Sequence, residues 1–198
     1  MLRVMADFLE VTTALEREAE YDTVFVDTEF TRLPLQKEHI RSWARSTGTI
    51  SVSAVPLDGG TPFYAVQNLS KKLRAQCSDF VLTEVLPHIE AAEVTCRFST
   101  PLQFKRAFAG YFKNRLAATE RRPLIAVDWI GDAFLLEYML PAQADILLLD
   151  QIPEVERSFE QFFTGSRRRH NAVHDAMALR EGYLACRQVT VRGRADAE

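Results

Sequence analysis

The chain has 198 residues, a net charge of −3 and 47% hydrophobic residues, which is enough apolar material for one sizeable globular domain. A calculated pI of about 5.9 excludes a protein whose whole surface is basic, although a local basic groove is compatible with it. The three cysteines are widely spaced without a CxxC pair, which predicts reduced thiols in a cytoplasmic setting, and no apolar run is long enough to predict a membrane span.

Apolar periodicity predicts an alternation of helices and strands along the chain. We expect a leading helix over about 5–19 and a basic insert over about 32–47, directly after the first strand. A single domain is expected over 1–189, followed by a frayed tail over 190–198. The expected strands are 22–29, 48–57, 61–68, 123–129 and 144–150, and the later helices are 78–91, one capped by Thr100, 132–140, 153–163 and 171–187.

The order of these elements predicts the fold class. Three β-rich runs come first, and Asp58-Gly59-Gly60 between the second and third is a hairpin signal. Helices and strands then alternate, which is typical of parallel strands with crossover helices. The sequence therefore predicts an α/β protein whose mixed sheet has an antiparallel meander, then parallel strands, with flanking helices. This order fits the ribonuclease H-like architecture.

Two acids lie inside the first predicted strand, in the run VFVDTEFT. Side chains alternate faces along a strand, so Asp27 and Glu29 point the same way. Two unpaired carboxylates on a half-buried face are costly and raise each other's pKa. A basic partner, a proton or a metal ion must therefore offset them.

Three further acids lie where apolar elements end or pack. Asp128 and Asp132 mark the passage from a buried strand into a buried helix, and Asp175 lies beside the apolar stripe of the last helix, five residues after His170. Carboxylates without thiols suit Mg²⁺ or Mn²⁺ and not zinc. Two such ions about 3.5–4 Å apart form the arrangement used for in-line phosphodiester cleavage.

The runs DTE and HNAVHD, with an aspartate at the head of a helix between them, resemble the DEDDh 3′–5′ exonucleases, and in particular a bacterial exoribonuclease-like subgroup. That family includes ribonuclease T, oligoribonuclease and polymerase proofreading domains. The resemblance covers about 22–187. It implies metal-dependent hydrolysis of single-stranded nucleic acid from the 3′ end, RNA more than DNA, to nucleoside 5′-monophosphates, and it implies a homodimer. The residues that it assigns to two divalent cations, Mg²⁺ or Mn²⁺, are Asp27, Glu29, Asp132 and Asp175, with His170 as general base.

The chain departs from the family in its second motif. The family often has Asn-x-x-Phe-Asp there, whereas this chain has Asp128-Trp-Ile-Gly-Asp132. The register that keeps the spacing gives the metal role to Asp132 and leaves Asp128 in the asparagine place. Either aspartate is therefore a candidate ligand, with Asp128 otherwise a substrate contact.

Further substrate contacts are expected beside the acids. Lys37, Arg41 and Arg45 form one stripe if the insert is helical, with Trp43 close by. This pattern predicts phosphate contact and base stacking, with an ordinary solvated face as the alternative. The candidate substrate-binding residues are Phe30, Thr31, Arg41, Trp43, Arg45, Asp128 and Arg169.

Two other functions remain open at this stage. One is a catalytically silent single-strand-binding module on the same fold, and the other is a hydrolase of small nucleotides or dinucleotides. A short closed pocket favours the latter, whereas an open basic channel favours a polymer. A second histidine, His174, is expected on the surface.

Overall fold

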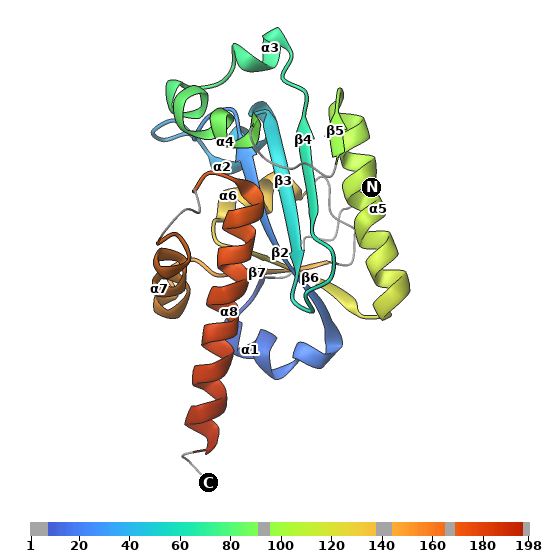
Figure 1. Ribbon diagram of the computed structural model, residues 1–198, viewed down its shortest axis with the longest axis vertical. Helices are drawn as coiled ribbons and strands as arrows, with labels where there is room; N and C mark the ends of the chain where they lie inside the picture. The colour runs from blue at the N-terminus through green and yellow to red at the C-terminus, as the bar shows by residue number, and fades with distance from the viewer. Residues whose placement is uncertain (1–7, 91–95, 138–143, 165–168, 196–198) are drawn as a thin grey trace.

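A computed structural model describes residues 8–90, 96–137, 144–164 and 169–195, which form one seven-stranded sheet with helices on both faces (Figure 1). The sheet order is β1-β7-β6-β2-β3-β4-β5. The strands are β1 (Phe8–Leu9), β2 (Tyr21–Phe30), β3 (Thr49–Pro56), β4 (Phe63–Gln67), β5 (Cys96–Phe98), β6 (Arg122–Val127) and β7 (Asp145–Leu148). The helices are α1 (Val11–Glu16), 3-10 helix η1 (Glu18–Glu20), α2 (Ile40–Ser46), α3 (Lys71–Arg74), π-helix η2 (Val81–Val85), α4 (Leu86–Glu90), α5 (Pro101–Thr119), α6 (Ile130–Leu136), α7 (Pro153–Phe162) and α8 (Ala172–Ala195).

The pairing of the strands confirms the predicted fold class. β3 is antiparallel to both β2 and β4, whereas β6 is parallel to β2 and to β7. Strands β4, β3, β2, β6 and β7 thus follow the spatial order 3-2-1-4-5, with the second strand antiparallel. This is the ribonuclease H-like arrangement, and it places β2 in the centre of the sheet.

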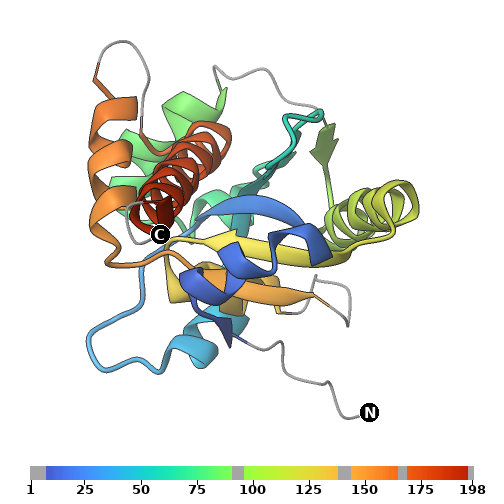
Figure 2. The ribbon, with the colours of Figure 1, turned by 90° about the horizontal axis from the view of Figure 1, so that it is seen from below.

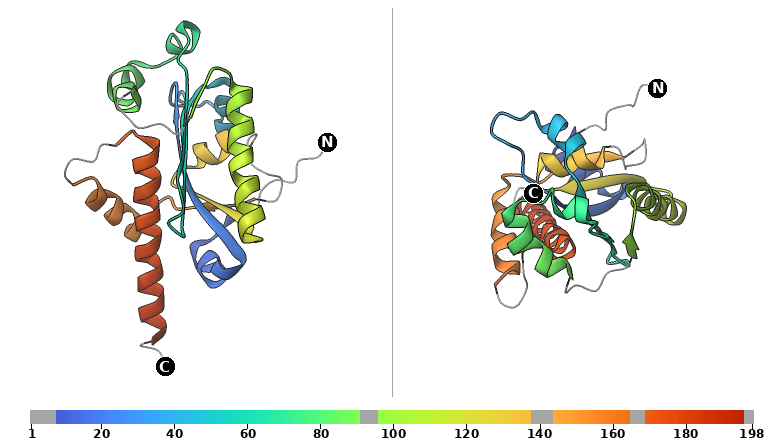
Figure 3. Two further views of the ribbon diagram at one scale, coloured as in Figure 1. Left: turned by 45° about the vertical axis from the view of Figure 1, so that its right-hand side comes forward. Right: turned by 90° about the horizontal axis from the view of Figure 1, so that it is seen from above.

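The two faces of β2 contribute to two different cores. Val24 and Val26 face a core shared with α5 and α6, whereas Phe25 faces a core shared with α8. Helices α5 and α8 accordingly lie on opposite sides of the sheet (Figure 2; Figure 3, left). Because side chains alternate along the strand, Asp27 and Glu29 share the α8 face with Phe25, and Thr28 shares the α6 face.

Both ends of the chain differ from the expectation. The leading helix predicted over 5–19 is present but shorter, because α1 spans only Val11–Glu16 and is followed by η1, whereas Phe8–Leu9 form β1 and pair with the open edge of β7. Residues 5–7 lie outside the described residues. The frayed tail predicted from 190 is wrong as far as Ala195, because α8 continues to that residue, and 196–198 lie outside the described residues.

The basic insert is only partly helical. Lys37 lies before α2 with φ 68°, so the predicted stripe of three cations is wrong and only Arg41 and Arg45 lie on the helix. The Arg41 guanidinium stands 4.9 Å over the ring of Phe134 on α6. Arg45 lines a separate cavity beside the start of α5.

Trp43 and Thr31 are structural residues that anchor the insert. Trp43 has no exposed surface, and its Nε1 donates to the carbonyl oxygen of Arg32 at 2.8 Å. Thr31 is also buried, and its hydroxyl accepts from the amide of Gly48 at 3.0 Å. Neither side chain can reach a substrate, so the expectation that they bind one is wrong.

The buried position of Trp43 makes a stability prediction. Trp43→Ala leaves a cavity and should lower the free energy of unfolding by about 3–5 kcal/mol. Arg45→Ala, on the exposed side of the same helix, should change it by less than about 0.5 kcal/mol. Urea unfolding of both variants measures the difference. Equal stability of the two variants would contradict the anchoring role of Trp43.

Candidate metal centre

The acids lie where β2 extends beyond the end of its neighbour β6. The parallel register pairs Phe25 with Ala126, and β6 ends one residue later at Val127. Asp128 therefore comes level with Asp27, and from that point one edge of β2 is no longer covered by a strand. The pairing of β2 with β3 is also irregular between Glu29 and Phe30, a feature that often re-aims side chains near active sites.

Helix α6 supplies the next acid from the opposite face of the sheet. The chain turns sharply after Asp128 and starts α6 at Ile130, which carries Asp132 in its first turn. The hydroxyl of Thr28 donates to Asp132 Oδ1. The predicted strand-to-helix passage is confirmed, and the Thr28 bond determines which oxygen of Asp132 remains available.

The start of α8 supplies the last acid. The Asn171 side chain accepts from the amide of Val173 at 3.2 Å, and Asp175 Oδ2 accepts from the amide of Asn171 at 3.1 Å. The hydroxyl of Ser53 on β3 donates to the carbonyl of Ala172 at 2.8 Å and ties this turn to the sheet. The run after His170 thus caps its own helix and directs Asp175 at β2.

Two groups of carboxylates result, and Asp27 belongs to both. The oxygens of Asp27, Glu29 and Asp175 lie within 4.8 Å of one another, and so do those of Asp27, Asp128 and Asp132. All are hard oxygen donors without a thiol, which suits Mg²⁺ or Mn²⁺. Among the described residues, none is recorded as donating a hydrogen bond to Asp27 or Glu29. The donors fit two divalent cations that share Asp27.

The electrostatics of the acids point the same way. Burial is the main reason that the pKa values of Asp27 and Glu29 lie well above the usual range, with the charge of Asp175 next. Burial also raises the pKa of Asp132 well above its usual range. Burial and the neighbouring Asp128 raise the pKa of Asp175 to about 7. Each raised pKa favours the protonated acid in the absence of metal, and bound cations would favour the carboxylate form instead.

His170 stands beside the acids, just before α8. It has φ 62°, a left-handed conformation in which histidine is enriched among non-glycine residues. Its ring meets Phe80 edge-to-face at 5.0 Å between centroids. Burial lowers the pKa of His170, and the charge of Arg169 lowers it further, which favours the neutral form of the ring. The expectation that His170 precedes the helix is correct.

A cavity of about 270 Å³ joins these groups. Its lining includes eight of the twelve residues predicted from the sequence, which are Asp27, Glu29, Phe30, Asp128, Asp132, Arg169, His170 and Asp175. Thr31, Arg41, Trp43 and Arg45 are not among its lining residues. His174 does not line it either, and its side chain is half-buried, so the expected surface position is wrong.

Sequence reasoning missed the apolar walls of the cavity. Phe80 and Trp129 both line it, and the Trp129 ring lies 5.5 Å from Phe30 and 5.1 Å from Trp43 between centroids. A Cβ at Gly131 would lie 2.0 Å from an atom of the Trp129 ring, so only glycine allows this packing. The signal for Trp129 was its position between the two aspartates, whereas Phe80 carries no local signal.

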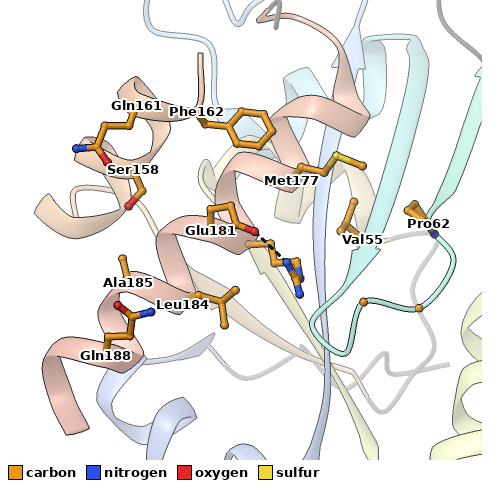
Figure 4. A pocket seen from close by; sticks show the side chains of 13 residues that line it. Val55, Pro62, Ser158, Gln161, Phe162, Met177, Glu181, Leu184, Ala185 and Gln188 are labelled. Carbon is orange, nitrogen blue, oxygen red and sulfur yellow. Dashed lines mark hydrogen bonds and ion pairs between the residues drawn. The ribbon is translucent and has the colours of Figure 1, made fainter. Parts of the chain in front are cut away.

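A larger cavity lies elsewhere. It has a volume of about 800 Å³ and lies between the β3–β4 hairpin, α7 and α8 (Figure 4). Arg180 and Glu181 form an ion pair at its wall, and none of the predicted site residues lines it. Its size therefore does not make it the catalytic candidate.

Comparisons with known proteins do not assign a function to the chain, so the assignment rests on the geometry of the site. No family model matches the chain, and a search of curated proteins finds no similar sequence. Among solved structures, the chain is similar to the RNase domain of the yeast Pop2 protein, with a TM-score of 0.47 and 9% identity over 90% of this chain and 85% of that one. A likeness of this strength carries no functional argument. Among the described residues, no helix is both long and apolar enough to cross a membrane.

The raised pKa of Asp175 predicts how metal-free stability depends on pH. The folded state binds this proton more tightly than the unfolded state, so the stabilisation is complete below about pH 4 and is lost as the pH rises through about 7. Asp175→Asn mimics the neutral acid. In chelator, it should therefore gain stability relative to the parent across this range.

Melting temperatures of both proteins at several pH values measure this difference. The asparagine variant should lose its advantage when millimolar Mn²⁺ is added, because the ion binds the folded parent. A constant difference between the two proteins from pH 4 to pH 8 would contradict the shifted pKa.

Proposed function

We propose that the protein is a metal-dependent phosphodiester hydrolase of the DEDDh 3′–5′ exonuclease type, acting on single-stranded nucleic acid, with RNA preferred over DNA. The observation that carries the proposal is the pair of carboxylate groups that share Asp27 at the end of a central strand, with His170 lining the same cavity. A purely structural role gives no reason to bury acids without cations. The resemblance of the runs around Asp27 and His170 supplies the polarity of cleavage.

Each side chain has a distinct role in this proposal. Asp27, Glu29 and Asp175 would hold one divalent cation, and Asp27 would share the second with the acids around α6. When bound, the cations polarise the phosphate and lower the pKa of the attacking water. His170 would accept the proton of that water. Its lowered pKa favours the unprotonated ring that a general base needs.

The substrate would enter the cavity between its apolar walls and the guanidinium of Arg169. Arg169 lines the cavity, and its guanidinium packs 5.2 Å from the ring centre of Phe159, which fixes its position for a phosphate contact. Phe30 is half-buried at the end of β2 and lines the cavity, and in this proposal it would contact the terminal nucleotide. Arg41 and Arg45 lie outside the cavity, so any contact that they make would be with a strand that continues beyond it.

A hydrolase of short substrates is the second candidate. Arg169 is the only lysine or arginine among the described residues that line the cavity, and the other lining residues are mainly acidic or apolar. A lining with a single basic side chain can neutralise few phosphates, so it would bind a long nucleic-acid strand weakly. Dinucleotides should therefore be degraded at least as well as longer strands if this candidate is correct.

The activity itself is the first test. End-labelled single-stranded RNA and DNA, with dinucleotides in parallel, are incubated with Mn²⁺, Mg²⁺ or chelator. We expect nucleoside 5′-monophosphates only with metal, and a 3′-phosphate should block the reaction whereas a 5′-phosphate should not. Cleavage of a circular strand would refute an exonuclease, and binding without turnover would favour the silent module.

The histidine assignment makes a second prediction. His170→Ala should reduce turnover by about 10²–10⁴-fold while the affinity for Mn²⁺ changes little, because the ring accepts a proton and holds no ion. His174→Ala is the matched control, since this side chain does not line the cavity. Turnover and the Mn²⁺-induced shift in melting temperature are measured for both. Loss of turnover in the control alone would show that the wrong histidine was assigned.

A further inference from the structure

The two aspartates of the second motif are held in different ways. Asp132 is 3% exposed, and one of its oxygens accepts the hydroxyl of Thr28. The hydrogen bond from Thr28 engages this oxygen on the α6 side of the sheet, and an oxygen of Asp132 lies within 4.8 Å of those of Asp27 and Asp128. Asp132 is therefore a constrained ligand at most.

Asp128 has the more open position. It follows β6 directly and lies level with Asp27. It lines the cavity of the acids and also an adjoining cavity of about 470 Å³, whose wall includes Asp150 and Arg169. Asp128 is half-buried, whereas Asp132 is buried.

Asp128 lies within the centre of acids. Its carboxylate oxygen and those of Asp27 and Asp132 all lie within 4.8 Å of one another, close enough for one cation to touch all three. The cation that acts on Asp128 is Arg169. A fifth acid at this point would repel the other four unless a metal ion lay between them.

We propose that Asp128 is a direct ligand of the second ion, so that five carboxylates hold the two ions of this centre. The inference rests on the proposed function. Two divalent cations balance four carboxylates, and the fifth leaves one net negative charge. The second ion should therefore bind more tightly than it would with asparagine at 128. Arg169, at the rim of both cavities, would offset the extra charge when a phosphate approaches.

The test is a calorimetric titration of the full chain with Mn²⁺. The parent should bind two ions. Asp128→Asn keeps the shape of the side chain and should weaken the second ion by about tenfold or more, with the first ion unchanged. The Mn²⁺ concentration for half-maximal activity should rise by the same factor.

Asp150→Asn is the matched control. Asp150 is exposed, lines only the adjoining cavity of the two, and carries the same charge close to Asp128. Its removal should leave both ions unchanged, which separates ligation from a general effect of charge. Melting temperatures of both variants establish that they are folded.

The outcomes separate the two levels of the proposal. A parent that binds no Mn²⁺ would overturn the proposed function together with this inference. Two ions bound with parental affinity in Asp128→Asn would overturn the inference alone. A raised KM with unchanged ion binding would also overturn it and would assign Asp128 to the substrate. If Asp150→Asn weakened the second Mn²⁺ as much as Asp128→Asn does, the effect would be one of general charge, and the inference of direct ligation would be overturned.

Discussion

The burial of several carboxylates around Asp27, with no basic side chain recorded in an ion pair with Asp27 or Glu29 among the described residues, is the constraint on which the rest of the structure depends. Moving an ionised carboxylate out of water costs several kcal/mol even after the protein relaxes. The described residues offset little of this cost, because the ion pairs recorded among them involve other acids, such as Asp22 with Arg115 and Asp145 with Arg122. The centre is stable when protons or cations occupy it, and this links folding to ligand binding.

The fold creates this centre through a mismatch of strand lengths. β2 continues to Phe30, whereas its parallel neighbour β6 stops at Val127. The open edge leaves room for a turn and for the start of α6, so acids from both faces of the sheet meet at one strand end. Ligand sites at the carboxyl ends of strands follow from the same geometry in other open α/β sheets.

Aromatic packing holds the parts together around the acids. Phe30, Trp43 and Trp129 contact one another with centroids 4.9–5.5 Å apart, and they join the end of β2 to the insert and to the second motif. On the other side, Phe80 supports the ring of His170. The segment around η2 comes from between β4 and β5 and so brings a distant part of the chain to the histidine. These contacts turn separate motifs into one cavity.

The sequence by itself determined the order of the five main strands along the chain, the common direction of Asp27 and Glu29 and the cap of α5 at Thr100, because alternation, periodicity and capping are local properties. It also identified Asp128, Asp132, Asp175 and His170 as candidates, since charges beside apolar runs need an explanation. Tertiary structure alone decided that Trp43 and Thr31 are buried, that Phe8–Leu9 pair with β7 and that Phe80 meets His170. It also brought Asp128 and Asp132 to the same partner. Such contacts join segments far apart in the chain, and their burial depends on packing that no local pattern encodes.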